Sequence, residues 1–136
     1  MKQLLVIFAI FLCSKSAVFA QVMAQKAQWV TITSANLKCW TCKEKLEKYL
    51  ISENESTMES GILQRKYNLV KGEIRIQFLP DRVSVDVIKT VINNAGFDAD
   101  AELAEPEAYK KLPPICKREA DGGGPKPGKP CHIAPM

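Results

Sequence analysis

The chain is poor in the residues on which most catalytic centres and nucleic-acid surfaces depend. Its 136 residues include one histidine and two tryptophans, and the formal net charge is only +4. No histidine stands near the Cys-x-x-Cys motif at 39–42 to act as a base, and neither a glycine-rich phosphate loop nor a paired-carboxylate signature occurs. The weak charge and the few aromatic platforms argue against nucleic-acid binding. We therefore expect a protein that is not an enzyme and has no nucleic-acid partner.

Long apolar runs are also scarce, and the longest one lies at the N-terminus. Lys2 precedes an apolar stretch over residues 4–13, and Ala20 can occupy the last position before a cleavage site, which is typical of a secretory signal peptide. The stretch is shorter than the roughly 20 residues that a transmembrane helix needs. We predict a signal peptide over residues 1–20, cleaved after Ala20 or Ala24. The mature protein would be periplasmic or secreted, would not span a membrane, and would carry a net charge of 17 − 15 = +2.

Five cysteines are encoded, and Cys13 would leave with the signal peptide. The four that remain are Cys39, Cys42, Cys116 and Cys131. An exported chain can keep disulfides, and four cysteines allow three connectivities. A bridge between Cys39 and Cys42 would close only a very small loop. Their spacing at a loop–helix junction instead favours two thiolates that face one ion.

Hydrophobic periodicity predicts an α+β domain. Residues 28–34 and 73–79 alternate apolar and polar side chains, as half-buried strands do. Apolar residues recur at helical spacing from Cys42 to Leu50 and again over 84–95, between an N-cap at Ser84 and a stop at Gly96. Two weaker strands are predicted over 62–70 and 97–103. The order is β-α-β-β-α-β, a ferredoxin-like sandwich with a four-stranded antiparallel sheet and two helices on one face.

The predicted domain is followed by a tail of different composition. Residues 21–27 form a short N-terminal lead, 28–104 the folded domain, and 105–136 the tail. The run DGGGPKPGKP at 121–130 is rich in glycine and proline, which is typical of a flexible linker. We expect a monomer in which the tail carries none of the hydrophobic core.

Two segments of the sequence resemble a known family. NLKCWTCKEKLEKYL and VKGEIRIQFLPDRVSVDVIKTVINNAGFDAD are similar to the heavy-metal-associated domain family, over residues 29–103. That family includes small copper chaperones, periplasmic mercury-binding proteins and repeats of metal-pumping ATPases. The resemblance implies that Cys39 and Cys42 are the metal ligands, and it places Phe97 where bacterial members often have a tyrosine beside the metal loop. It also implies transient docking with a metal transporter or another metal-binding protein.

The residues around the motif depart from the usual family pattern. Asn36 stands where a glycine is usual, and it can replace glycine in a left-handed conformation. Leu37 can fill the apolar position of the family's methionine, and Lys38 places a cation beside the site. Trp40 would either shield the sulfurs or contact a partner protein.

Thiolates select soft metal ions. Two of them suit nearly linear Cu(I), whereas a closed structural zinc site needs four ligands. The start of a helix and the neighbouring lysines favour the thiolate form, which is the ligand form. We therefore expect the chain to bind and carry Cu(I), with Hg(II) or Zn(II) as alternatives, for metal trafficking or resistance outside the cytoplasm.

Two alternatives remain open from the residues alone. The same Cys39–Cys42 spacing occurs in thiol–disulfide oxidoreductases, although Trp40 and Thr41 replace the Gly-Pro common in that class. In the tail, Cys116, Cys131 and His132 could form an auxiliary soft-metal site, or Cys116 and Cys131 could form a disulfide. A tail without either role is the third reading.

Overall fold

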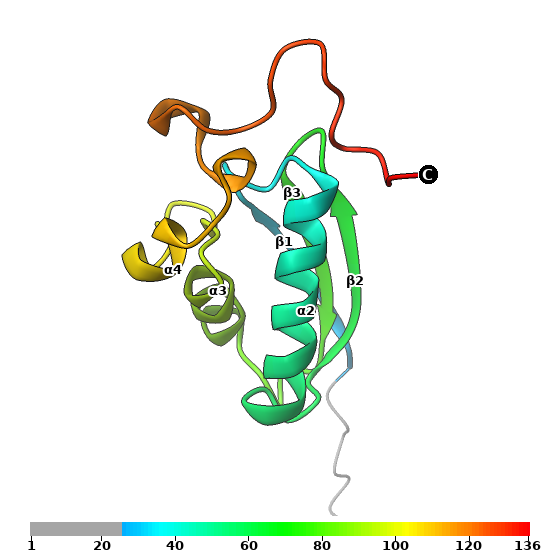
Figure 1. The fold of residues 1–136 in the computed structure, drawn as a ribbon. Coiled ribbons are helices and arrows are strands. Elements are labelled where there is room, and N and C mark those ends of the chain that lie inside the picture. Colours follow the sequence, from blue (N-terminus) through cyan, green and yellow to red (C-terminus); the bar gives the residue numbers. More distant parts are fainter. Residues whose placement is uncertain (1–25) are drawn as a thin grey trace, which may run out of the picture.

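A computed structural model describes residues 26–136 of the protein (Figure 1). The predicted signal peptide and both candidate cleavage positions, Ala20 and Ala24, lie outside the described residues. Within residues 26–136, no helix is long and apolar enough to cross a membrane.

Three antiparallel strands form the sheet in the order β1-β3-β2. They are β1 (Gln28–Thr33), β2 (Ile62–Asn68) and β3 (Glu73–Phe78). In the central strand β3, Ile74 pairs with Ile32 of β1 on one side and with Tyr67 of β2 on the other. Ile74, Ile76 and Phe78 are buried, as the alternation predicts. The sheet therefore turns one apolar face towards the helices.

Two helices cover that face of the sheet (Figure 1). Helix α2 spans Trp40–Ser56, so it begins two residues before the predicted start and runs into the segment 52–61 that was predicted as a loop. Helix α3 spans Val85–Asn94, and the hydroxyl of its N-cap Ser84 accepts a hydrogen bond from the Val87 N–H. Gly96 follows α3 with φ +94°, a conformation that glycine adopts without strain.

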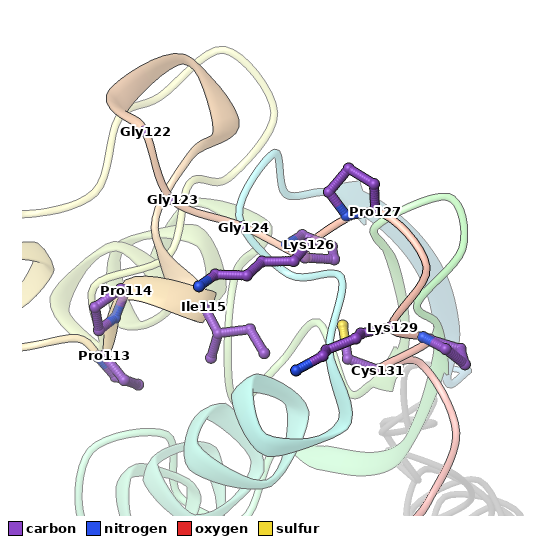
Figure 2. A pocket seen from close by; sticks show the side chains of 12 residues that line it. Pro113, Pro114, Ile115, Gly122, Gly123, Gly124, Lys126, Pro127, Lys129 and Cys131 are labelled. Atoms are coloured by element: carbon purple, nitrogen blue, oxygen red, sulfur yellow. The ribbon is translucent and has the colours of Figure 1, made fainter.

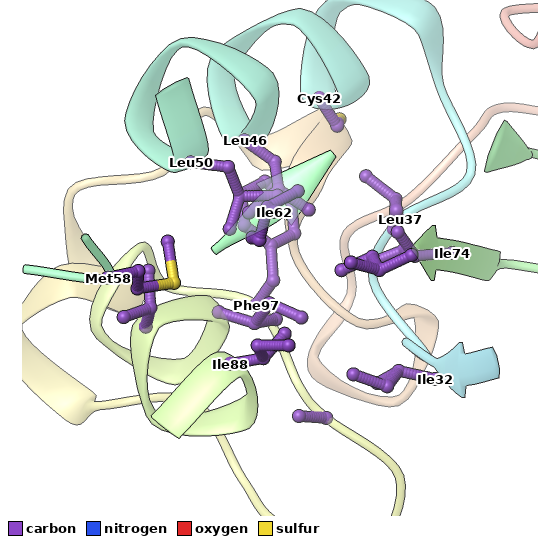
Figure 3. Packing of buried hydrophobic residues seen from close by; sticks show 14 of the residues in the cluster. Ile32, Leu37, Cys42, Leu46, Leu50, Met58, Ile62, Ile74, Ile88 and Phe97 are labelled. Atoms are coloured by element: carbon purple, nitrogen blue, oxygen red, sulfur yellow. The ribbon is translucent and has the colours of Figure 1, made fainter. Parts of the chain in front are cut away.

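Apolar side chains from both helices and the sheet meet in one core (Figure 3). Helix α2 contributes Leu46 and Leu50, α3 contributes Ile88, and β3 contributes Ile74, all fully buried. Phe97, which follows α3, is also fully buried in this core. The core therefore fixes both ends of the predicted metal loop, which runs from β1 into α2.

The predicted fourth strand over residues 97–103 is wrong. Within the described chain this segment makes only an isolated bridge between Ala99 and Glu102. The Asp98 carboxylate accepts the Ala104 N–H at 2.9 Å, which folds the segment back on itself. Asp100 adopts φ +55°, and its N–H reaches the Thr33 carbonyl at 2.8 Å, so the chain contacts β1 at one point and then turns away. The sheet has three strands.

The structure also differs from the predicted tail. After residue 104 the chain forms helix α4 (Pro106–Lys110) and the two 3₁₀ helices η2 (Pro114–Cys116) and η3 (Glu119–Asp121). Leu112 and Cys116 belong to the hydrophobic core, with exposed fractions of 3% and 0%. The core thus continues past the predicted boundary, because the tail supplies apolar side chains and cross-links to it.

Candidate metal centre

The two predicted ligands lie in a single turn at the N-terminal end of α2. Cys39 is the N-cap residue, and Cys42 follows in the first turn. The N–H groups of Cys42 and Lys43 both donate to the Cys39 carbonyl, at 3.1 and 3.0 Å. Both cysteines are fully buried. Residues three apart on a helix are neighbours on one face, so the two side chains share one side of this turn.

Each of these cysteines forms a disulfide with the tail. Cys39 is bonded to Cys131 and Cys42 to Cys116, with Cα–Cα distances of 4.7 and 5.5 Å. Of the readings left open for the tail, a disulfide between Cys116 and Cys131 is not formed in this structure. The tail passes across the N-terminal end of α2 (Figure 1), which brings each tail cysteine to a different residue of the motif. In this oxidised state, residues 26–136 contain no group of three or more His, Cys, Asp and Glu side chains that could hold a metal ion.

Asn36 ties the metal loop to the tail through its buried side chain. Its Nδ2 donates to the carbonyls of Gly96 and Cys116, both at 3.0 Å. Its Oδ1 accepts the Asp98 N–H at 3.0 Å and the Ser34 hydroxyl at 3.2 Å. Asn36 does not adopt the left-handed conformation expected for a replacement of glycine. Its role is to satisfy buried backbone groups of two segments at once, residues 96–98 and the segment that carries Cys116.

The segment that carries Cys116 is also held by an ion pair. Arg118 donates to Asp98 through Nε at 2.7 Å and through Nη2, and Asp98 is 3% exposed. This hydrogen bond raises the pKa of the Arg118 guanidinium, and burial opposes the rise. The Tyr109 hydroxyl accepts the Arg118 N–H at 2.8 Å and donates to Asp121 at 2.6 Å. The bidentate pair between Arg118 and Asp98 fixes both the distance and the orientation of the two side chains.

The loop that carries Cys131 is held much more loosely. A cavity of about 530 Å³ separates residues 113–115 from residues 122–131, and Lys126 and Lys129 lie along its rim (Figure 2). Among the described residues, the backbone hydrogen bond that joins 125–131 to the rest of the fold runs from the Trp40 N–H to the Cys131 carbonyl, at 2.6 Å. His132, the predicted auxiliary ligand, is exposed and borders a smaller hollow with Lys38 and Cys131.

The predicted site-shaping residues fall into two groups. Leu37 and Phe97 are fully buried and belong to the core. Lys38 and Trp40 are partly exposed at the rim of the site: the Lys38 ammonium pairs with Glu119 at 3.2 Å, and the Lys43 ammonium lies 4.6 Å from the centre of the Trp40 ring. Trp40 therefore packs under a cation at the start of α2 and is not a free loop side chain.

The electrostatic setting favours negative charge at the sulfurs. The first turn of α2 contains no acidic residue, so the partial positive charge of the helix N-terminus is not cancelled there. Lys38 stands directly before Cys39. Once the disulfides are reduced, these groups favour the thiolate form, which can bind a soft metal ion, whereas the full burial of Cys39 and Cys42 opposes it.

Asp98 and Arg118 hold the tail in place, and the sequence analysis did not single them out. Nothing in the tail sequence marks one arginine among many basic residues as the partner of Asp98. Asn36 was recognised only as a departure from the family pattern. The signal available for it was chemical: a buried amide next to a functional loop needs several hydrogen-bond partners.

No family model and no curated protein matches the chain. Several solved structures do. The CopZ metallochaperone is 22% identical over 53% of this chain and 98% of its own, with a TM-score of 0.45. Oxidized MerP from Ralstonia metallidurans is 19% identical over 55% and 96%, with a TM-score of 0.47. A copper-binding domain from HMA7, a P-type ATPase, is 24% identical over 53% and 89%, with a TM-score of 0.45. In each case about half of this chain aligns with most of the other chain.

Proposed function

We propose that the reduced protein binds a soft, thiophilic metal ion between Cys39 and Cys42 and carries it to another protein. The observation that supports this most is the placement of both cysteines in the first turn of α2, on one face and beside a helix N-terminus free of acidic residues. Two thiolates in this setting favour Cu(I), and Hg(II) or Zn(II) are the alternatives. The proposed setting is outside the cytoplasm, after export, with the protein a monomer.

Metal binding in this proposal requires reduction of the disulfides. Cys39 and Cys42 have no free thiolate while they are bonded to Cys131 and Cys116. The oxidised protein is therefore the metal-free form, and it also protects the motif from irreversible oxidation. The proposed partners are a metal transporter or another metal-binding protein. The partner docks transiently, and the ion passes to it as the partner's ligands replace the thiolates of Cys39 and Cys42.

A competitive Cu(I) titration of the reduced mature protein tests the proposal, with mass spectrometry to read the stoichiometry. The reduced protein should bind one equivalent tightly, and the oxidised protein should not. In a C116S/C131S background, C39S and C42S should each abolish tight binding, because the one remaining thiolate cannot hold the ion alone. H132A is the matched control, since its exposed side chain is outside the pair. Wild-type affinity in both cysteine variants would contradict the ligand assignment.

The second candidate function is thiol–disulfide exchange. Its supporting observation is that Cys131, unlike the fully buried cysteines Cys39, Cys42 and Cys116, is partly exposed, so a partner thiolate could reach its sulfur. The disulfide assumed for that class, between Cys39 and Cys42, is absent from this structure. Insulin reduction assays separate the candidates, because an oxidoreductase turns over and a carrier does not.

A further inference from the structure

Four cysteines meet at the N-terminal end of α2. Each disulfide joins one residue of the motif to one residue of the tail, across Cα–Cα distances of 4.7 and 5.5 Å. Cys39 and Cys42 are themselves neighbours in one helical turn. Both disulfides therefore attach to the same helical turn, although their residues span positions 39 to 131 of the sequence.

We infer that Cys116 and Cys131 join the motif in the reduced protein to form a four-thiolate site for one divalent ion of tetrahedral preference, such as Zn(II) or Cd(II). This inference rests on the proposed function, because it uses Cys39 and Cys42 as two of the ligands. It extends that function from a two-thiolate pair suited to linear Cu(I) to a closed site with the ligand number of structural zinc centres.

Cys116 stays beside the motif without its disulfide, because other contacts hold its segment. The Asn36 amide donates to the Cys116 carbonyl at 3.0 Å. Two residues later, Arg118 is paired with the buried Asp98. Four residues earlier, Leu112 is 3% exposed in the core. Cys116 itself is fully buried, so reduction leaves its thiol facing Cys42 across the same contact (Figure 3 shows Cys42 at the top of the core, pointing to this segment).

Cys131 is the detachable ligand. Its loop is rich in glycine and proline, lies over the cavity of Figure 2, and touches α2 through the Trp40 N–H and the disulfide. After reduction this backbone hydrogen bond and the weak contact of the Cys131 thiol with the Lys38 carbonyl, at 3.8 Å, remain to hold Cys131 in place. A metal ion bound to the other three cysteines would recruit this thiolate as the fourth ligand and close the loop over the site.

The chemistry of the cycle balances with a dithiol as the reductant. Two dithiol molecules reduce the two disulfides, giving four thiols in the protein and two oxidised dithiols. Binding of one Zn(II) by four thiols releases four protons and leaves a site of charge −2. The acid-free first turn of α2 and the adjacent Lys38 stabilise this charge. Oxidation of the four thiolates by two disulfide molecules would restore both bridges and release the ion.

Titration of the reduced mature protein with Co(II), followed by displacement with Zn(II), tests the site. Co(II) is the probe because its visible absorption and its sulfur-to-metal charge transfer report tetrahedral thiolate ligands. We expect one equivalent with a four-thiolate spectrum. C116S should weaken Zn(II) binding by about a hundredfold or more, and C131S by about tenfold. The loss is larger for C116S because Cys116 is held beside the motif, whereas Cys131 lies in a loosely held loop. H132A should bind as the wild type does.

Cysteine labelling provides a readout that does not depend on the variants folding. Zn(II) should protect all four thiols of the reduced wild type from alkylation, mapped peptide by peptide. If Cys116 and Cys131 are labelled equally fast with and without Zn(II), or if C116S/C131S binds Zn(II) as tightly as the wild type, the four-thiolate site is overturned. The proposed function then still stands as long as C39S/C42S loses binding. Unchanged binding in C39S/C42S would instead overturn the proposed function.

Discussion

The two tail segments that reach the metal motif are built in opposite ways. Residues 106–121 form three short helices that bury Leu112 and Cys116 and pair Arg118 with Asp98. Residues 122–131 form an extended glycine- and proline-rich loop that leaves a cavity of about 530 Å³ beneath it. Each segment contributes one cysteine that forms a disulfide with the same turn at the start of α2. The first would remain in place without its disulfide, whereas the second depends on it.

Because the two segments are held so differently, we expect the two disulfides to have different roles. A cross-link stabilises a protein to the extent that it restricts the unfolded chain more than the folded one. The Cys42–Cys116 bridge joins parts that the folded state already holds together. The Cys39–Cys131 bridge also restrains a loop whose other polar contacts with the start of α2 are the Trp40–Cys131 backbone hydrogen bond and a weak contact with the Lys38 carbonyl. The first is suited to a structural role and the second to opening and closing the site.

The largest expected effect is the loss of the structural bridge. With sequence separations of 74 and 92 residues, each bridge would restrict the unfolded chain to a similar extent, which corresponds to an entropic stabilisation of about 4–5 kcal/mol. We expect C42A/C116A to lower the free energy of unfolding by about 3–4 kcal/mol, and C39A/C131A by only about 1 kcal/mol, because the freed loop regains entropy in the folded state. Urea unfolding of both variants beside the wild type measures this. Equal losses would show that the loop is held as firmly as the helical segment.

The next effect is the order of reduction. Under a limiting dithiol, the Cys39–Cys131 bridge should open at least about tenfold faster than Cys42–Cys116, because a thiolate can reach the partly exposed Cys131. The attack joins the dithiol to Cys131 and releases Cys39 as a thiolate at the N-terminus of α2, where that charge is stabilised. Timed alkylation with peptide mapping follows the two bridges. Unfolded protein is the control, since the difference should vanish there.

How much of this the sequence predicted depends on whether a feature is local. The alternation in β3 and the capping of α3 at Ser84 are properties of short segments, and both predictions are confirmed. The spacing of the apolar residues after Cys42 likewise predicted that the cysteine pair lies at the start of a helix.

Other features depended on contacts that are distant in sequence. The fourth strand over 97–103 failed because the Asp98 side chain captures the Ala104 N–H and Asp100 turns the chain, which outweighs the apolar character of the segment. The disulfide pairing could not be read from four cysteines with three possible connectivities. It follows from the path of the tail, which is held by the burial of Leu112, by the hydrogen bond from Asn36 to the Cys116 carbonyl and by the Asp98–Arg118 ion pair.

Loss of the Asp98–Arg118 ion pair should have an intermediate effect on the free energy of unfolding. D98N keeps the size of the side chain but removes the charge facing Arg118, and we expect the free energy of unfolding to fall by about 2 kcal/mol, less than for a fully buried pair because Arg118 is partly exposed. The Cys42–Cys116 bridge should also become faster to reduce, while Cys39–Cys131 should not. E107Q is the matched control, because its pair with Lys110 is exposed on both sides and should matter little. Unchanged reduction of Cys42–Cys116 in D98N would separate the ion pair from the site.

The smallest expected effect is a pH dependence at the end of the anchored segment. The Tyr109 hydroxyl, followed by Arg118, lowers the pKa of the Asp121 carboxyl below its ordinary value near 4. A carboxyl whose pKa is lowered by folding stabilises the folded state above its unfolded pKa, and this contribution disappears as pH falls through the folded pKa. The melting temperature of the wild type should therefore exceed that of D121N at pH 6, and the two curves should converge as the pH approaches 2. Asp121 is bonded to Tyr109 and Arg118 of the anchored segment and not to the loop that carries Cys131. The reduction rate of Cys39–Cys131 should therefore be nearly the same in both proteins. Curves that stay parallel down to pH 2 would mean that Asp121 does not anchor this segment through its charge.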